Sequence, residues 1–135
     1  MIYKTTELTI TIHPNTIVEV KAREDLEGIF TMEGAKENRA LLEKIIDNKP
    51  RCILLWIPKF YISKDIIKYN NEFEQDFITT AFITSSFSSK ILGNLVLTLR
   101  SRFLSSDKIK NNPIKLFTDR EEALSWLLEI QNSQQ

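Results

Sequence analysis

The chain has 135 residues, 42% of them hydrophobic, with 18 basic and 18 acidic side chains and no formal net charge. This length suits one domain, residues 1–135, with a single sizeable core, and the composition is that of an ordinary globular protein rather than a disordered one. A dedicated nucleic-acid-binding protein usually carries a basic surplus, so the charge balance argues against a nucleic-acid partner. The same neutrality leaves little repulsion between copies of the chain, which permits self-association.

Cys52 is the single cysteine, which excludes an intramolecular disulfide and a multi-cysteine metal site. It lies in the apolar run CILLWI, where a small buried side chain is the expected role. No apolar run approaches the roughly 20 residues that span a bilayer. The first 14 residues alternate in polarity rather than forming the apolar core of a signal peptide. We therefore expect a cytoplasmic protein with no integral membrane segment, no metal and no cofactor.

The first strong pattern is ELTITIHPNTIVEVKA, residues 7–22, which alternates with period two on both sides of a Pro-Asn pair. Alternation around such a breaker predicts a β-hairpin. The only histidine, His13, has no carboxylate or cysteine close to it in the sequence, so we interpret it as a strand-face residue rather than a catalytic or metal-binding one. Leu8, Ile10 and Ile12 are expected to share one face of the first strand, and Ile17, Val18 and Val20 are expected to begin the second.

Helical and strand patterns alternate after the hairpin. Thr31 is expected to cap a helix that carries Glu33 in its first turn and ends at residues 48–50. The continuous apolar run of residues 52–57 is typical of a strand covered on both faces. Ser63 then begins a second predicted helix, residues 63–77.

Residues 78–84, ITTAFIT, are rich in β-branched side chains and predict another central strand. Ser85 and Ser86 are expected to cap a third helix that runs to Phe103 and whose apolar residues nearly encircle it. Such a helix is either deeply buried or covered by a partner. The alternation of LVLTL leaves a strand open as the alternative for this segment.

A short strand, residues 114–117, leads into the closing helix. Thr118 is expected to be its N-cap, with Glu121 three residues on as a capping box. An apolar stripe that includes Trp126 needs a broad apolar surface, which a sheet provides. The resulting order, β-β-α-β-α-β-α-β-α, predicts an α/β fold with a mixed four- to five-stranded sheet and about four helices.

The end of the chain resembles an uncharacterised bacterial family in which a Lys-Leu-Phe strand leads into a Glu-Glu-Ala-x-x-Trp-Leu helix. The segment TTAFITSSFSSKILGNL, residues 79–95, resembles the corresponding strand and helix of that family. The family is similar in fold to STAS domains, the SpoIIAA-like anti-sigma-factor antagonists, and more distantly to the CRAL-TRIO lipid-transfer lobe. The resemblance implies a non-enzymatic domain that works through protein contacts. The matching residues are Lys115, Leu116, Phe117, Glu121, Glu122, Ala123, Trp126 and Leu127.

In the antagonists a switch serine stands at the start of the helix that follows the central strand. The same alignment brings Ser63 nearest to this position, which implies a possible phosphorylation switch, although Ile62 stands where an acidic residue would precede it and no glycine follows. A phosphate there would be tolerated at a helix N-terminus. The alternative role of Ser63 is structural, because an N-cap serine accepts an amide hydrogen bond.

Two further groups of residues are candidates for binding. Ser85, Ser86 and Lys90 lie between a strand end and a helix start, where an anion or ligand can be held, although helix capping explains the serines equally. The basic residues between positions 100 and 115 would attract an acidic partner or lipid headgroup, or would simply be a solvated loop. The apolar third helix offers a possible partner surface formed by Ile91, Leu95 and Leu99.

These patterns favour a non-enzymatic cytoplasmic module that acts in regulation or protein interaction, with an unknown protein partner and a possible homodimer. The homodimer follows from the third helix, which would leave a large exposed apolar patch if only one of its faces packed. The alternative is a small-molecule or lipid-binding domain that uses the apolar interior. We do not expect an enzyme, because the sequence contains no catalytic motif and no acid and base that can be placed together.

Overall fold

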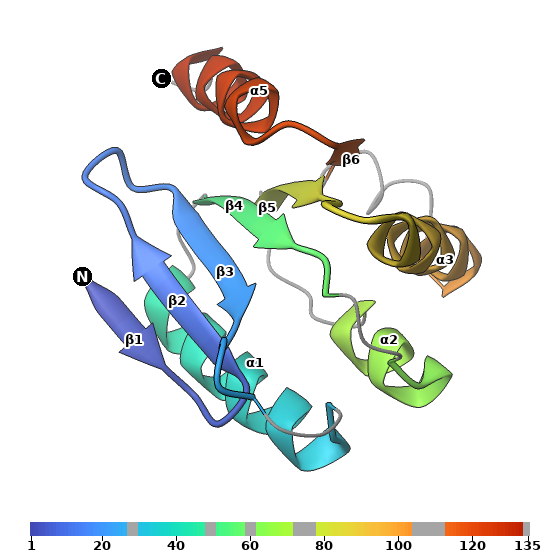
Figure 1. The fold of residues 1–135 in the computed structure, drawn as a ribbon. Helices are drawn as coiled ribbons and strands as arrows, with labels where there is room; N and C mark the ends of the chain where they lie inside the picture. The colour runs from blue at the N-terminus through green and yellow to red at the C-terminus, as the bar shows by residue number, and fades with distance from the viewer. Residues whose placement is uncertain (27–29, 48–50, 59–61, 72–77, 104–112, 134–135) are drawn as a thin grey trace.

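The computed structural model describes residues 1–26, 30–47, 51–58, 62–71, 78–103 and 113–133, with backbone only for residues 71, 78 and 99–103. Within these residues the chain forms an α/β fold of six strands and four helices (Figure 1). In chain order the elements are β1 (Ile2–Lys4), β2 (Leu8–Ile12), β3 (Val18–Ala22), α1 (Met32–Ile46), β4 (Arg51–Trp56), α2 (Lys64–Asn71), β5 (Ile78–Ile83), α3 (Phe87–Phe103), β6 (Ile114–Phe117) and α5 (Arg120–Ser133).

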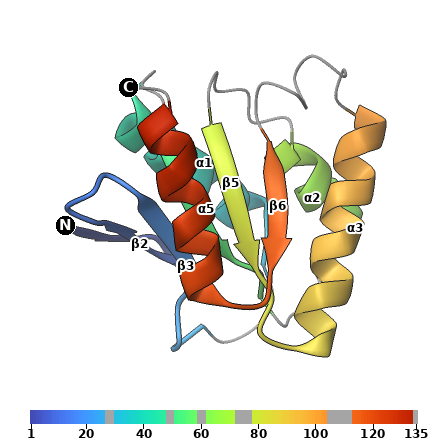
Figure 2. The ribbon, with the colours of Figure 1, turned by 90° about the horizontal axis from the view of Figure 1, so that it is seen from above.

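The strands lie in the sheet in the same order as in the chain, β1-β2-β3-β4-β5-β6. The two N-terminal pairs, β1-β2 and β2-β3, are antiparallel, and the three later pairs are parallel. Each parallel step is made through a helix that moves the chain in the same direction across the sheet. Because such crossovers are right-handed, all three place their helices on one face. Among the described helices, Figures 1 and 2 show α1, α2 and α3 on that face and α5 on the other.

The register explains why the two faces carry different numbers of helices. One row of paired residues crosses all six strands and is apolar throughout, so this face needs cover along its whole width. The neighbouring row points to the opposite face. It is apolar at Leu54 and Ala81, which a single helix can cover, and at the exposed edge residue Ile2. The first row is Tyr3, Ile10, Val20, Leu55, Phe82 and Leu116, and the second is Ile2, Thr11, Glu19, Leu54, Ala81 and Lys115.

The mixed α/β sheet and the four helices confirm the fold class expected from the sequence, but the number of strands was underestimated. The missed strand is β1, which pairs with β2 at the edge of the sheet. It spans only three residues, so its alternation is too short to distinguish a separate strand from the start of the hairpin.

The start of α1 is confirmed, since Thr31 is its N-cap and the Thr31 hydroxyl accepts a hydrogen bond from the Gly34 N–H at 3.0 Å. The predicted start of the closing helix is wrong by one residue. The Asp119 carboxylate, not Thr118, accepts the N–H of Glu121 at 3.2 Å, and the first helical bond runs from the Ala123 N–H to the Asp119 carbonyl.

The strand alternative for LVLTL is also wrong, because these residues lie within α3. The second predicted helix, residues 63–77, is confirmed as far as Asn71, and residues 72–77 lie outside the described part of the chain. Helix α3 approaches the sheet closely at Gly93, where a Cβ atom would stand 2.9 Å from Leu116 and 3.3 Å from Thr84. A larger residue at position 93 would therefore push α3 away from β5 and β6.

The closing helix packs on the sheet as its apolar stripe predicts. Ala123 and Leu127 are fully buried, and Trp126 is half-buried with its ring centroid 5.6 Å from that of Phe117. They belong to one continuous group, which we call the α5-side cluster: Ile17, Cys52, Leu54, Ala81, Ile83, Ala123 and Leu127.

Candidate ligand-binding cavity

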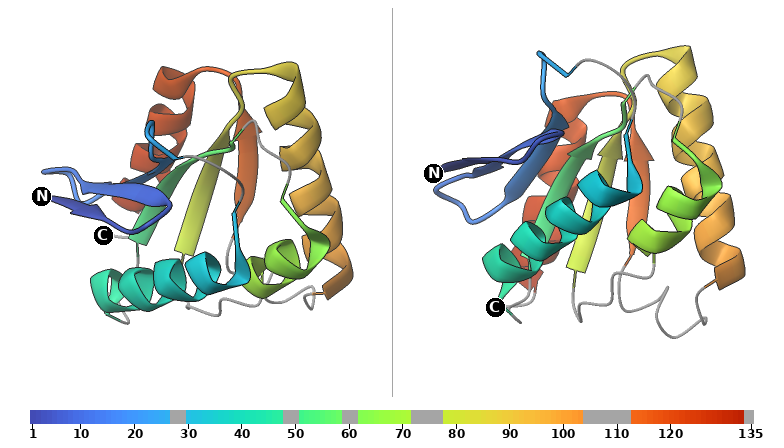
Figure 3. Two further views of the ribbon diagram at one scale, coloured as in Figure 1. Left: turned by 60° about the horizontal axis from the view of Figure 1, so that its bottom comes forward. Right: turned by 90° about the horizontal axis from the view of Figure 1, so that it is seen from below.

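The sheet face that carries α1, α2 and α3 has three separate groups of buried side chains rather than one. The first lies between α1 and the sheet, the second between α1 and α2, and the third between α2, α3 and the sheet. Figure 3 shows α1 and α2 following one another along this face. The buried members are, in turn, Ile10, Val18, Val20, Ile46 and Ile53; Phe30, Ala35 and Ile66; and Ile57, Ile67, Phe82 and Leu92.

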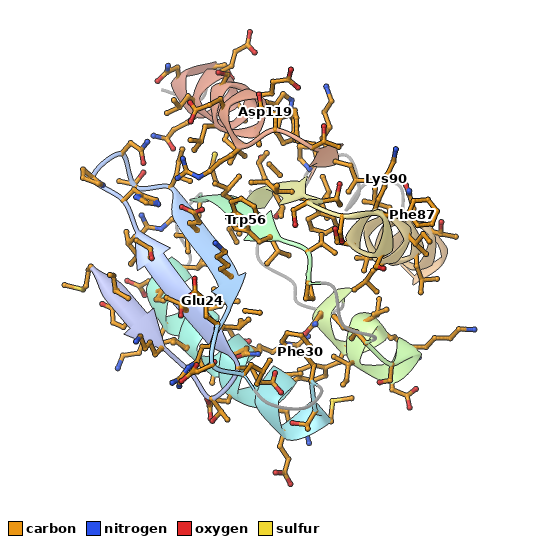
Figure 4. The ribbon with its side chains drawn as sticks, viewed as in Figure 1. Glu24, Phe30, Trp56, Phe87, Lys90 and Asp119 are labelled. Carbon is orange, nitrogen blue, oxygen red and sulfur yellow. The ribbon has the colours of Figure 1, made fainter. Side chains whose placement is uncertain are left out.

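A cavity of about 270 Å³ separates these three groups. Of the 23 described residues that surround it, 18 are apolar, so the cavity offers mainly aliphatic and aromatic contact. Small side chains on different elements, Ala22, Ala35 and Thr80, leave this space unfilled. Figure 4 shows Phe30, which also borders the cavity, below the sheet where α1 meets α2.

The polar residues around the cavity are few. The least exposed of them is Glu7, which lies in the turn between β1 and β2. It is only 3% exposed. One of its carboxylate oxygens, Oε2, accepts the N–H of Thr31 at 2.8 Å and the Thr31 hydroxyl at 3.3 Å. The other, Oε1, accepts the side-chain amide of Asn38 at 3.2 Å. Glu7 therefore joins the β1–β2 turn to the first two turns of α1.

Two observations show how tightly this carboxylate is held. The hydroxyl of the buried Thr5 donates to the Asn38 carbonyl oxygen at 2.6 Å, which fixes the orientation of the amide that serves Glu7. A Cβ atom at position 34 would collide with the Glu7 carboxyl group, so only glycine permits this close approach. The N-terminus of α1 also favours a negative charge at this point through its dipole.

Arg39 of α1 also borders the cavity. It lies over the ring of Tyr69, with 3.8 Å between the guanidinium carbon and the ring centroid, and it donates a hydrogen bond to the Tyr69 carbonyl. Both contacts join α1 to α2. Arg39 therefore acts as a bridge between these two helices at the border of the cavity.

The opposite face of the sheet carries a polar network centred on Glu19 of β3. Its carboxylate accepts the indole N–H of Trp56 at 2.6 Å and the Arg120 guanidinium at 2.9 and 3.2 Å. The ring of His13 lies 2.8 Å from the same carboxylate. The ammonium group of Lys21 stands 4.7 Å from the centre of the Trp56 ring. This network ties the start of α5 to the middle of the sheet.

Burial by itself would raise the pKa of Glu19. Hydrogen bonds from Arg120, Trp56 and His13, together with the charge of Arg120, outweigh it and lower the pKa to about 2. Glu19 is thus ionised across the physiological range, and its role is to hold α5 on the sheet. The carboxylate that contacts His13 lies on the other strand of the hairpin, so a search for partners close to His13 in the sequence did not find it.

The structure places Ser63 at the N-cap of α2. Its hydroxyl oxygen accepts the Ile66 N–H at 3.3 Å, and its carbonyl accepts the Ile67 N–H at 3.0 Å. The structural role of Ser63 is therefore present, while its phosphorylation stays a prediction. Ile66 and Ile67 both border the cavity, so this cap sets the position of one cavity wall.

The serines before α3 are engaged in capping as well. The Ser86 hydroxyl accepts the Ser89 N–H at 3.1 Å, and the Ser89 hydroxyl accepts the Ser86 N–H at 3.0 Å. Ser85 is exposed, and Lys90 points away from the sheet on the outer side of α3 (Figure 4). The three residues proposed as an anion site are therefore near one another in the chain, but both hydroxyls of the Ser86–Ser89 pair are committed to the helix start.

The predicted partner surface is divided between two sides of α3. Ile91 is 55% exposed, whereas Leu95 is half-buried and packs against the third cluster. Leu99 lies in α3, but its side chain is outside the described residues, as are those of Arg100 and Arg102. The exposed neighbour of Ile91 is Phe87, which is 79% exposed one helical turn earlier and which the sequence analysis did not select.

Sequence reasoning also missed Glu7, Arg39, Glu19 and Arg120. Glu7 and Arg39 look like ordinary surface charges in the sequence, because nothing local indicates that a cavity lies beside them. Trp56 borders the cavity and packs against the α5-side cluster, whereas the nearby aromatic residues Phe60 and Tyr61 lie outside the described residues.

No family model, curated protein or solved structure matches this chain. The resemblance to STAS domains therefore stays a prediction beyond the shared α/β class. Within the described residues no group of three or more His, Cys, Asp or Glu side chains is placed to hold a metal ion. In the same residues, no helix combines the length and the apolar character that crossing a membrane requires.

Proposed function

We propose that this domain binds a small apolar molecule in the cavity between the sheet and helices α1, α2 and α3, without catalysing a reaction. The observation that carries the proposal is the volume of about 270 Å³ with its predominantly apolar wall. An engineered apolar cavity of about 150 Å³ binds benzene. By the same scaling, this cavity has room for a ligand of roughly ten non-hydrogen atoms.

The energetics also favour an occupant. The apolar side chains that border the cavity lack van der Waals partners on the side that faces it. A domain of this kind is stable by only about 5–15 kcal/mol in total. A ligand that restores the missing van der Waals contacts would therefore stabilise the fold substantially.

The test uses benzene and 1-octanol as probes. Both are expected to raise the midpoint of thermal unfolding and to shift the NMR methyl signals of Ile66, Leu92 and Val96, which border the cavity. Ala35→Leu fills part of the cavity and is expected to abolish both effects. The matched control is Ala40→Leu, an exposed position on the same helix, which should bind like the wild type. Absence of any shift with saturating probe, or equal binding by the Ala35→Leu variant, would refute the proposal.

A second candidate is a regulatory or protein-interaction module in the cytoplasm that forms a homodimer, akin to the STAS-like antagonists. Phe87, labelled in Figure 4, and Ile91 favour it, since they expose large apolar side chains one turn apart on α3. The chain also has no net charge to keep copies apart. Light scattering at high micromolar concentration tests it. A dimer mass that Phe87→Ser reduces to the monomer would support the module, and a monomer mass throughout would exclude the homodimer.

A further inference from the structure

Glu7 differs from Glu19, the carboxylate of the polar network on the other face of the sheet, in the kind of partners it has. Glu19 is 15% exposed at its side chain and forms an ion pair with Arg120 at 2.9 Å. Glu7 is 3% exposed, and among the described residues all its hydrogen-bond donors are neutral: a backbone amide, a hydroxyl and a side-chain amide. Both oxygens of Glu7 accept hydrogen bonds from these donors. A buried charge is normally paired with a charge of opposite sign.

The arginines in this region of the fold are directed elsewhere. Arg23 donates to the Thr5 carbonyl at 3.1 Å and otherwise pairs with Asp25 at 2.7 and 2.9 Å. Arg39 stacks on Tyr69 and donates to its carbonyl. Glu7 itself lies in the wall of the apolar cavity. A cation that reached this carboxylate from the cavity would meet it in surroundings with little water, where such a pair is strong.

We propose that the ligand of the cavity is an apolar amine, whose ammonium group binds Glu7 and whose hydrocarbon body fills the space between the three helices and the sheet. This inference rests on the proposed ligand-binding function and deepens it. The rigid setting of the carboxylate supports it, because Thr31 and Asn38 donate to the acceptor, and Thr5 orients the Asn38 amide, before a ligand arrives. The apolar wall of the cavity therefore selects a hydrocarbon body for the ligand, and Glu7 selects a positively charged group at one end of it.

The experiment compares three probes that share one chain length: octylamine, 1-octanol and octanoate. Binding is followed by calorimetry and by the side-chain carboxyl ¹³C signals of the glutamates. Octylamine is expected to bind the wild-type protein about tenfold more tightly than 1-octanol, because a charge-assisted hydrogen bond is worth at least that factor. Octanoate is expected to bind more weakly than either, since its charge is repelled by Glu7. Octylamine should shift the Glu7 carboxyl signal.

Two variants separate the role of Glu7 from general effects. In Glu7→Gln, the advantage of octylamine over 1-octanol should disappear while 1-octanol still binds. The control is Glu37→Gln, which removes the same charge from an exposed residue that also joins α1 to the β1–β2 turn through the Thr6 N–H at 2.5 Å. The Glu37→Gln variant should keep the full preference for octylamine. In the wild-type protein, octylamine should not shift the carboxyl ¹³C signal of Glu37.

The outcomes distinguish the two proposals. If 1-octanol and octylamine bind equally, or octanoate binds best, the amine inference is overturned and the apolar cavity site stands. If none of the three probes binds, the proposed function itself fails. Should Glu7→Gln not fold, as judged by its circular dichroism, the wild-type ranking and the Glu7 carboxyl shift still decide the question, since neither needs a variant.

Discussion

The two faces of the sheet bury similar kinds of side chains but pack them differently. On the α5 side, α5 is the one described helix on the apolar part of the sheet, and the described buried residues there form one continuous cluster. On the other side, three helices cover the full width of the sheet, and their buried residues form three groups around a cavity of about 270 Å³. The face that is covered by more helices is therefore the face on which the side chains leave a cavity.

The topology gives the physical reason. Three consecutive crossovers in one direction force α1, α2 and α3 onto the same face, where each must pack on the sheet and also beside its neighbour. Helix α5 meets no such constraint in the described structure, because it lies alone on its face and can settle on the sheet (Figure 2). The cavity therefore lies on the face where each helix must pack both on the sheet and against its neighbouring helix.

The largest expected difference between the faces concerns matched leucine truncations. Leu127 is fully buried in the α5-side cluster, so Leu127→Ala should lower the free energy of unfolding by about 4 kcal/mol. Leu92 borders the cavity and already lacks partners on one side, so Leu92→Ala should cost about 2 kcal/mol. Urea denaturation of both variants measures the difference. Equal losses would mean that the two faces are packed alike.

The reverse substitution sharpens the same comparison. Ala123 and Ala35 are both almost fully buried alanines on helices, one on each face. Ala123→Leu adds volume to a filled cluster and should destabilise the protein by about 2 kcal/mol. Ala35→Leu extends into the cavity and should leave the free energy of unfolding within about 1 kcal/mol of the wild type. A severe loss from Ala35→Leu would show that the cavity cannot accept added atoms.

Acid should weaken the attachment of α5 in particular. The pKa of Glu19 is lowered from 4.5 to about 2 in the folded protein, so its contribution to stability is complete above pH 4.5 and is lost as the pH falls towards 2. Glu19→Gln should cost about 1–2 kcal/mol at pH 7, because Arg120 is partly exposed and its ion pair is screened. Between pH 4.5 and 2, the stability of this variant should fall less steeply than that of the wild type. Parallel pH curves in denaturant titrations would contradict this role.

The sequence predicted the elements with long periodic patterns and missed those that depend on distant contacts. The hairpin, the central strands and the helices follow from periods of 2 and 3.6 residues and from caps such as Thr31. The start of α5 was misplaced because TDREE offers two capping residues in succession, Thr118 and Asp119, each with a glutamate three residues on. Nothing local decides between them.

The candidate site was harder to predict than the fold. A cavity is the space left by side chains on several elements, so no single segment carries its signal. Glu7 is out of phase with the inward-facing positions of β2, which made it look like a surface charge. Only the position of α1 over the β1–β2 turn buries it. The Glu19 network likewise joins residues from three distant segments, β3, β4 and α5.

The smallest expected effect concerns the cap of α2 on the looser face. Ser63→Ala removes the acceptor of the Ile66 N–H and should lower the free energy of unfolding by about 1 kcal/mol. The described part of helix α2 spans eight residues and begins at this cap, so amide hydrogen exchange should accelerate there more than in α5. Ser63→Asp keeps an acceptor and adds a negative charge that the helix N-terminus favours, so its stability should match the wild type. If Ser63→Asp is instead destabilised as much as Ser63→Ala, a phosphate at this position would unfold the start of α2 rather than be accommodated by it.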